Sequence, residues 1–471
     1  MILWVSKNGE GLPIARHMHR HGAPVVVFIG DAFYREKRLY DGLLPQVATL
    51  EAGLKCRPEC VIFDSSAMGD LADGIGKYLP VWGGSAIADA MEQDRGFGIE
   101  LMARCGIRIP RTVIFDPLRG EDGLPDAQVP FSRVRGHLEE AIAFVRREKA
   151  RWIIKPYASG GSAGTYVSHD PNDMVEYLQH LLEQRTLPLL EPFLLQEWKD
   201  GVEVSTEVWL RHGEIVPGSW SGTIERKKFM AGDLGPATGA STSVVWAYQK
   251  EPKILEYTFP PAFRAWLRRP EGPDGRVHPP LHGPCDLNVI VSDAEPHIPY
   301  GLEFTVRFGY GAYFALAEVL GEGWHTILPA AAQGTLAHLP TKAGFGYACR
   351  VTVPPYPVDD EISHEKKPDL YRDIMEIGTG VDLGGPTDSE HVWLIDARMK
   401  NGNLETAGTD GIVCECSGHG ATIEAACDQA EALVKDLVIA NKQARLLDGA
   451  DRARHDGPVL RAWGYDFPGA G

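Results

Sequence analysis

The sequence lacks the long apolar stretches that cross a membrane. Its longest apolar runs, such as APVVVFIG at 23–30, have the length of a strand and fall far short of a bilayer span. The N-terminus, MILWVSKNGEG, also lacks the basic start and the long apolar stretch of a signal peptide. We therefore expect a cytoplasmic protein without a membrane partner.

A basic excess is missing as well. Lys and Arg number 47 against 64 for Asp and Glu, which gives a formal net charge of −17. Because phosphate-backbone binding needs a basic field, this balance argues against a general DNA or RNA surface. A local basic pocket for a small phosphate compound remains compatible with it. The length of 471 residues suffices for two to four domains and a large core.

Paired cysteine motifs are also absent. The eight cysteines are scattered, and neither Cys56/Cys60 nor Cys414/Cys416 has the spacing of a zinc knuckle. The segment CECSGH, which ends at His419, suggests a metal cluster, but its alternation fits a strand equally well. We favour the strand.

The N-terminal part alternates strand and helix patterns. This rhythm predicts a parallel sheet with helices on both faces. His17, His19 and His21 lie on the first predicted helix, and their spacing puts only His17 and His21 on one face. We expect them to be surface residues rather than ligands. The predicted strands are 2–6, 23–31 and 60–66, and the predicted helices are 8–22 and 88–106.

The middle of the chain changes pattern after a turn-rich boundary at 107–130. A helix at 136–150 and a strand at 151–157 precede the segment 192–220, whose strands and turns indicate an antiparallel arrangement. A helix at 421–447 is followed by a Pro/Gly-rich end that we expect to be loose.

Lys155 stands at the end of the strand RWIIKPY (151–157), and the loop ASGGSAGT (158–165) follows it. Glycines such as Gly160 and Gly161 let a backbone approach a ligand closely, and their N–H groups can cradle a phosphate. The lysine supplies a point charge. Because GK[ST] and a directly following helix are missing, this is not a P-loop, and taken alone the segment favours a surface turn.

Two further segments carry polar groups beside turns. In LLQEWKDGVEVS (194–205), a strand end can offer backbone groups to an adenine ring, with Glu203 reaching a ribose. Taken alone, the segment favours an ordinary hairpin with a KDG turn. In ERKKFMAGDLGPATGAS (225–241), three consecutive basic residues precede a turn-rich loop. That loop could bind a phosphorylated, anionic substrate or be a solvated basic surface.

The stretch GLEFTVRFGYG (301–311) places Glu303, Thr305 and Arg307 on one strand face. Asp286 and Asn288, in CDLNVIVSD (285–293), would sit on a neighbouring strand. Oxygen ligands from two adjacent strands make a magnesium site that phosphates and water complete. Along a strand, Glu303 and Arg307 are about 13 Å apart, too far for a direct salt bridge, so each needs other partners.

The order of these features resembles the ATP-grasp superfamily, and within it the phosphoribosylamine–glycine ligases. The family's LEFNCRFGDPE is similar to LEFTVRFGYG, its EEFLDGEEAS to QEWKDGVEVS, and its GDTGPNTGG to GDLGPATGA. Its QLEGSKAF is similar to AMEQDRGF (90–97), and its IKADGLAAGKGV to IKPYASGGSAGTYV. The similarity spans residues 1 to about 440.

The resemblance implies an ATP- and Mg²⁺-dependent ligase that joins a small-molecule carboxylate to an amine through an acylphosphate, as in purine biosynthesis. By position, Lys155, with Gly160 and Gly161, would hold the ATP phosphates, and Arg95 stands where the family has a second lysine. The other implied roles are adenine binding by Glu197 and Trp198, ribose binding by Glu203, metal binding by Glu303, Asn288 and Thr305, substrate binding by Asp233, Pro236, Thr238 and Arg307, and catalysis by Arg307 and Lys155.

The departures from the family lie mainly on the substrate side. Thr305 replaces the family's metal-binding asparagine, and Asn288 or Asp286 would compensate. The lysine of the glycine-rich loop is missing, and Ala237 and Ala240 replace an asparagine and a glycine. Three interpretations follow: the ligase itself, a divergent ligase with other substrates, or a descendant that binds nucleotide without turnover.

The resemblance also implies the architecture. We expect an α/β and α+β multidomain protein with the ATP-grasp fold, a Rossmann-like N-terminal domain and a small β-rich C-terminal domain, present as a monomer or homodimer. The predicted divisions are 1–95, 96–340 (with a smaller nucleotide-clamping lobe within 156–220), 341–450 and a loose tail at 451–471.

Overall fold

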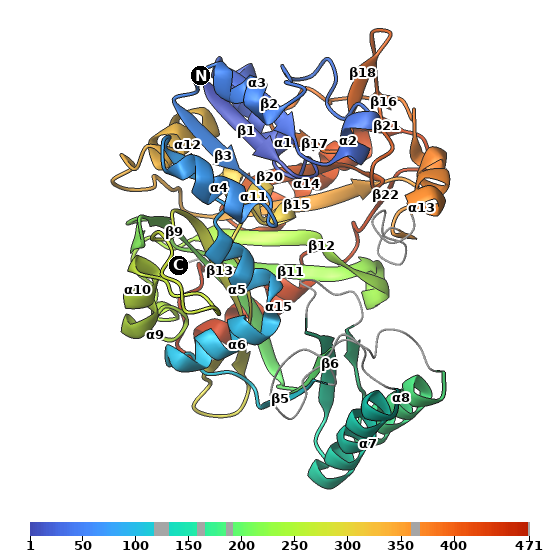
Figure 1. The fold of residues 1–471 in the computed structure, drawn as a ribbon. Coiled ribbons are helices and arrows are strands. Elements are labelled where there is room, and N and C mark those ends of the chain that lie inside the picture. Colours follow the sequence, from blue (N-terminus) through green and yellow to red (C-terminus); the bar gives the residue numbers. More distant parts are fainter. Residues whose placement is uncertain (117–130, 158–164, 185–191, 359–367, 470–471) are drawn as a thin grey trace.

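The computed structural model describes residues 1–116, 131–157, 165–184, 192–358 and 368–469. Three larger sheets organise these residues, and helices cover them (Figure 1). Among the described helices, none is both long and apolar enough to cross a bilayer.

The N-terminal sheet is parallel, with the strand order β2-β1-β3-β4. Ile2 and Trp4 of β1 belong to one apolar core, and Leu3 and Val5 belong to another, so the sheet is covered on both faces. The predicted βαβ rhythm is thus confirmed. The elements are β1 (Ile2–Ser6), α1 (Leu12–Arg20), β2 (Val25–Ile29), α2 (Ala32–Glu36), α3 (Leu50–Lys55), β3 (Cys60–Phe63), α4 (Gly69–Gly76) and β4 (Val81–Trp82).

The single helix predicted at 88–106 is two helices, α5 (Ala86–Gln93) and α6 (Arg95–Arg104). Asp94 breaks the helix with φ −92° and ψ 87°, and its side chain accepts a hydrogen bond from the Phe97 N–H at 2.9 Å. An aspartate in this role caps a new helix N-terminus. The break puts Arg95 at the first position of α6.

A small antiparallel sheet and two helices form a lobe with its own apolar core, which includes Phe115, Trp152 and Phe193. The strand order is β5-β8-β6-β7. This small lobe lies at the lower right of Figure 1. Its elements are β5 (Thr112–Phe115), α7 (Phe131–Glu148), β6 (Trp152–Pro156), β7 (Tyr166–Val167), α8 (Pro171–Gln184) and β8 (Phe193–Glu197).

The large sheet has the order β14-β13-β9-β11-β12-β15-β20-β17, with β10 beside β9 and β22 beside β15. All its pairs are antiparallel, as predicted for the middle of the chain. Because β12 pairs with β15, the sheet continues across residue 340. Its strands are β9 (Gly201–Arg211), β10 (Glu214–Ile215), β11 (Ser221–Met230), β12 (Leu234–Ala247), β13 (Gly283–Ser292), β14 (Pro299–Thr305), β15 (Phe345–Thr352), β17 (Val392–Leu394), β20 (Ile412–Gly420) and β22 (Gln443–Ala444).

The segment CECSGH lies within β20, which confirms the strand interpretation, and all eight cysteines are free. The helix predicted at 421–447 ends at Asp436, because Leu437 is extended and the chain then pairs with an earlier strand. The remaining elements are η2 (Ala231–Asp233), α9 (Leu255–Thr258), α10 (Pro261–Arg268), α11 (Tyr310–Val319), α12 (Trp324–Ala332), α13 (Pro368–Met375), η4 (Glu376–Gly378), β16 (Leu383–Gly384), β18 (Arg398–Lys400), β19 (Asn403–Glu405), α14 (Ile423–Asp436) and β21 (Val438–Ile439).

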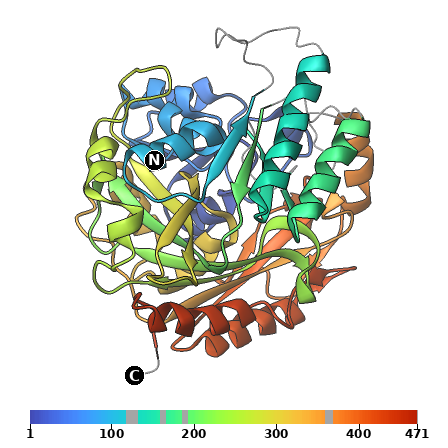
Figure 2. The same cartoon turned by 90° about the horizontal axis from the view of Figure 1, so that it is seen from below.

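The prediction of a loose tail after residue 450 is wrong for most of that segment. Residues Asp451–Ala462 form α15, which lies with α14 along the lower side of the view in Figure 2. Ala453, Gly457 and Leu460 are buried, and their spacing lines one helix face. Beyond the helix, the Phe467 ring packs on Trp246 with ring centroids 4.7 Å apart. Tertiary burial therefore orders a segment whose composition suggested looseness.

Candidate functional site

Neighbouring strands of the large sheet bring the predicted metal-binding residues together. In the ladder between β13 and β14, Asn288 lies opposite Glu303, and Asp286 lies opposite Thr305. On its other side, Asp286 lies opposite Glu207 of β9. The strand pairing therefore places a carboxylate, an amide and a hydroxyl side by side at one edge of the sheet.

Glu203, on β9, is the centre of a hydrogen-bonded cluster. Its Oε1 accepts from Lys227 Nζ and from Asn288 Nδ2, each at 2.8 Å, and its Oε2 lies 3.2 Å from Arg452 Nη2. Burial alone would raise the pKa of this carboxyl, but the charges of Lys227 and Arg452 and these hydrogen bonds hold it far below its usual range. Glu203 is therefore ionised at neutral pH.

Glu303 lies at the same place, with its Oε1 3.8 Å from Lys227 Nζ. Burial opposes its ionisation, yet the positive charges of Lys227, Lys155 and Arg95 outweigh burial and lower the pKa of Glu303. A carboxylate kept ionised by cations from three separate elements is suited to binding a metal ion together with anionic phosphates.

Lys155 reaches this cluster from the small lobe, where it lies near the end of β6. Its Nζ donates to Gln196 Oε1 at 2.9 Å, and the buried Gln196 in turn donates to Thr112 Oγ1 at 3.3 Å. Burial, opposed by Glu303 but aided by Arg95, lowers the pKa of Lys155 to about 8. The ammonium is thus oriented by β8 and remains mostly charged at neutral pH.

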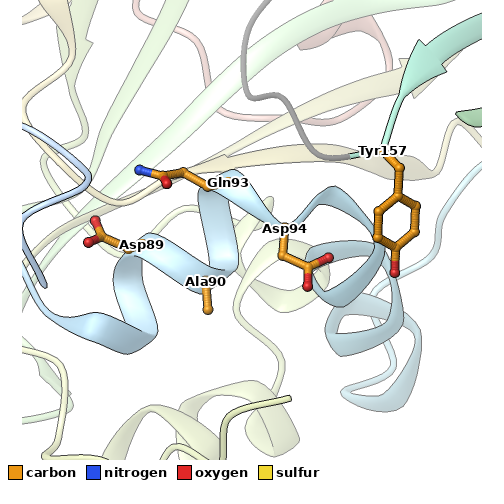
Figure 3. A pocket seen from close by; sticks show the side chains of 5 residues that line it. All are labelled: Asp89, Ala90, Gln93, Asp94 and Tyr157. Atoms are coloured by element: carbon orange, nitrogen blue, oxygen red, sulfur yellow. The ribbon is translucent and has the colours of Figure 1, made fainter. Parts of the chain in front are cut away.

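Arg95 joins α6 to the same strand, because its buried guanidinium donates to the carbonyl of Pro156. At Gly96 the chain approaches Tyr157 so closely that a Cβ would lie 1.9 Å from the Tyr157 hydroxyl oxygen. Beside this contact is a pocket of about 320 Å³, where Asp94 points toward Tyr157 (Figure 3). The pocket is lined by Asp89, Ala90, Gln93, Asp94 and Tyr157.

Glu197 and Trp198, predicted to line an adenine site, lie at the end of β8, where the small lobe leads into β9. The Glu197 N–H donates to the Arg111 carbonyl at 2.8 Å, and the Trp198 N–H donates to the Arg151 carbonyl at 2.9 Å. The Arg151 guanidinium stacks over the Trp198 ring at 3.8 Å. Both N–H groups are thus engaged within the protein, and the adenine role stays a prediction. Gly160 and Gly161 lie outside the described residues.

The segment 225–241 is a long hairpin of β11 and β12 rather than the predicted turn-rich loop. Lys227 points from it to Glu203, and Arg226 contacts Asp233 at 2.7 Å. Asp233 also contacts Arg445 at 2.8 Å, so its carboxylate is held by two cations. Of the other predicted substrate residues, Thr238 is buried and Pro236 is exposed on β12.

Arg307 departs most clearly from its predicted place. The expected alternation is present from Glu303 onward: Glu303, Thr305 and Arg307 are half-buried, and the residue after each of them is buried. However, β14 ends at Thr305 because the next N–H, from Val306, donates to Glu92 Oε2 at 3.1 Å. Arg307 Nε donates to Glu92 Oε1 at 2.8 Å, and its Nη1 lies 3.3 Å from Glu10 Oε2. The guanidinium therefore contacts the N-terminal domain rather than continuing the strand face.

Three residues of the cluster escape the sequence-based prediction. Lys227 was missed because its run of three basic residues was interpreted as part of a loop. The run lies on β11, where alternate side chains point to opposite faces of the sheet. Gln196 carries no signal beyond its place in a predicted strand. Arg452 lies 249 residues from Glu203, and no local pattern connects them.

The residues present fit a magnesium ion. Because the Nδ2 of Asn288 donates to Glu203, its Oδ1 is the atom left for a metal, beside the ionised Glu303. Hard oxygen ligands of this kind are the ones that Mg²⁺ prefers. Asp286 is less suited, because burial and the neighbouring Glu207 raise its pKa.

The sequence matches no family model. It is similar to phosphoribosylamine–glycine ligase of Rhizobium meliloti (strain 1021), with 24% identity over 374 residues that make up 78% of each chain. Among solved structures, phosphoribosylamine–glycine ligase of Thermotoga maritima gives a TM-score of 0.67 at 19% identity, covering 94% of this chain and 99% of its own. The biotin carboxylase domain of Hydrogenobacter thermophilus 2-oxoglutarate carboxylase, in complex with MgADP, ADP and bicarbonate, gives 0.59 at 10% identity and covers 98% of both chains.

Proposed function

We propose that this chain, which has the ATP-grasp fold expected from its sequence and resembles phosphoribosylamine–glycine ligase, joins a carboxylate to an amine at the expense of ATP. One observation carries the proposal. Lys155 of the small lobe and Lys227 of the large sheet converge, with Arg95, on the ionised carboxylate of Glu303. Such a cluster is suited to binding the negatively charged phosphates of a nucleoside triphosphate.

The chemistry requires two displacements. In the first, a carboxylate oxygen of the substrate bonds to the γ-phosphorus while the bond to the β,γ-bridging oxygen breaks, which releases ADP and leaves an acylphosphate. In the second, the amine bonds to the acyl carbon, the phosphate leaves, and the amine loses a proton. The protein contributes mainly positioning and charge neutralisation in both steps.

The described residues have definite roles in this scheme. Lys155, oriented by Gln196, would hold the phosphates. Arg95, which donates to the carbonyl of Pro156 at the end of β6, would add a second positive charge. Glu303 and Asn288 would hold Mg²⁺, which supplies further neutralisation of phosphate charge when bound. Glu203 positions Lys227 and Asn288 rather than reacting itself.

The finer proposal is a reaction of the phosphoribosylamine–glycine ligase type, as in purine biosynthesis. A specific observation favours a second candidate, a ligase with a different carboxylate or amine. Arg307, which the family resemblance assigns to substrate, is held by Glu10 and Glu92. This pairing supports changed substrates, whereas Thr305 in place of asparagine alters the metal-binding side of the site.

A mass-spectrometric screen tests the proposal. The purified protein, with Mg-ATP, is incubated with pairs of amino acids and amines, with glycine and phosphoribosylamine as the reference pair. We expect a condensed product and ADP with at least one pair, and neither product with Glu303→Gln. ATP that binds but is never consumed across the panel would contradict a ligase and favour a nucleotide-binding protein.

A further inference from the structure

Three histidines from α1 and α12 meet. Both helices lie in the upper half of the view in Figure 1, away from β6 and the small lobe. His17 lies in the last turn of α1, His21 caps that helix, and His325 lies in the first turn of α12. One ligating atom of each side chain lies within 4.8 Å of the others. The His17 and His21 rings stack with centroids 4.3 Å apart, and those of His21 and His325 with centroids 4.9 Å apart.

A carboxylate completes this group. Glu390, which precedes β17, places its Oε2 3.1 Å from His17 Nε2 and 3.6 Å from His21 Nε2. Its other oxygen lies 3.1 Å from Arg20 Nη2, so the carboxylate is oriented. In a tetrahedral zinc site with ligands at about 2.0–2.1 Å, neighbouring ligand atoms are roughly 3.3 Å apart. The two observed separations lie on either side of that value.

The hydrogen bonds leave ring nitrogens available. His21 Nδ1 donates to the carbonyl of His17 at 2.8 Å, which leaves the lone pair on Nε2; this backbone bond is the kind that orients metal-binding histidines. The Nδ1 atom of His325 is buried and, among the described residues, has no hydrogen-bond partner, so it can bind a metal. The Nδ1 atom of His17 has none either, and it would carry the proton when Nε2 binds the metal beside Glu390.

We propose that His17, His21, His325 and Glu390 bind one divalent metal ion of the zinc type, which ties α1 to α12 and to the segment before β17. Two histidines four residues apart at one helix face are a common zinc-binding pair. Three imidazoles and one carboxylate favour zinc, nickel or cobalt over magnesium. The proposed site is therefore separate, in place and in metal preference, from the one at Glu303. It also differs from the sequence-based expectation of plain surface histidines.

The test uses the full chain, freed of any affinity tag and stripped of metal with a chelator. Calorimetric titration with Zn²⁺ should show one tight equivalent. We expect His21→Gln and His325→Gln each to weaken binding at least ~10- to 100-fold, because even the loss of an outer partner of a metal ligand has an effect of this size. His19→Gln is the matched control, since His19 is exposed on the same helix and lies outside the group.

Two further measurements distinguish a lost ligand from a lost fold. Circular dichroism of the metal-free variants should match the parent protein. Zn²⁺ should raise the melting temperature of the parent and of His19→Gln, but not that of the ligand variants. Equal binding by all variants would place the metal elsewhere and overturn the proposal, and so would the absence of binding by the parent protein.

Discussion

Two groups of charged residues beside the ends of β13 and β14 differ in their balance of charge. Around Glu203 and Glu303, four cations arrive from the small lobe, from β11, from α6 and from α15. They face these two carboxylates and the nearby Glu225, whose pKa is raised by burial. Around Arg307 the balance is reversed, because one guanidinium contacts Glu10 and Glu92. The comparison shows that the first group is prepared for an added anion, while in the second the guanidinium is already paired with two carboxylates and joins the end of β14 to Glu10 and to α5.

The largest expected effect comes from removing the carboxylate charge at the first group. Glu303→Gln should lower ATP consumption by about 10³-fold, at the upper end of effects for a single charge-stabilising group, because the proposed metal loses its ionised ligand. The rate of ADP release, measured at saturating substrates, checks this. Glu256→Gln, which changes an exposed residue of α9, is the control and should retain the parent rate. A similar rate for both variants would remove Glu303 from the metal site.

A smaller loss of activity is expected when the small lobe no longer supplies the positive charge of Lys155. Lys155→Met should lower kcat/KM for ATP by about 10²-fold, since one cation of several is lost. Lys250→Met, which replaces a lysine that is 82% exposed, should leave it unchanged. Direct nucleotide binding to the two variants separates affinity from turnover. Equal ATP affinity and equal kcat/KM in both would contradict a phosphate-binding role for Lys155.

The pH dependence of kcat/KM for ATP tests the same role of Lys155. Because the pKa of Lys155 is lowered to about 8, kcat/KM for ATP should fall as pH rises through 8, up to about tenfold per unit. Lys155→Arg should move that fall to higher pH. For stability the sign is opposite: the unfolded state binds this proton more tightly, so the contribution of Lys155 to stability increases between pH 8 and the ordinary lysine pKa. A flat profile from pH 7 to 9.5 would contradict the assignment.

The smallest effect on activity is expected from a change in the second group, Arg307 with Glu10 and Glu92. Arg307→Gln leaves Glu10 and Glu92 without their shared cation, and its side chain is 23% exposed. We expect a loss of about 1–2 kcal/mol in the free energy of unfolding, reduced from the value for fully buried pairs by partial exposure. Denaturant titration measures the loss. ATP affinity should stay within about threefold, and a larger loss of ATP affinity than in Lys155→Met would reverse the comparison between the two groups.

Much of the fold could be predicted from local patterns. Period-two alternation and β-branched runs identified β1, β6 and β14, and the change from alternating strand and helix to antiparallel strands separated the N-terminal sheet from the large one. The break at Asp94 was missed, because an aspartate that caps a helix looks the same in sequence as one on a helix surface. The helix α15 was missed because its buried residues Ala453 and Leu460 belong to an apolar core that residues far away in the sequence, such as Trp246, help to form.

The candidate site likewise has a part that local sequence patterns predict and a part that only the folded chain shows. Asn288 and Glu303 could be placed side by side because neighbouring strands carry them, and strand register follows from alternation. The partners of Glu203 could not, since Arg452 comes from a helix 249 residues away. Arg307 was placed on the strand face because the ladder was expected to continue. The carboxylate of Glu92 ends it by accepting the Val306 N–H, and only the folded chain shows this.

The most direct test of the central claim follows an oxygen atom. The carboxylate substrate identified in the screen is labelled with ¹⁸O in both carboxyl oxygens and incubated with Mg-ATP, its amine and the parent protein. The account predicts that one ¹⁸O appears in the inorganic phosphate for each product formed, because the acylphosphate carries a carboxylate oxygen to phosphorus. Product formation with unlabelled phosphate would contradict an acylphosphate and, with it, the proposed role of the cluster around Glu303.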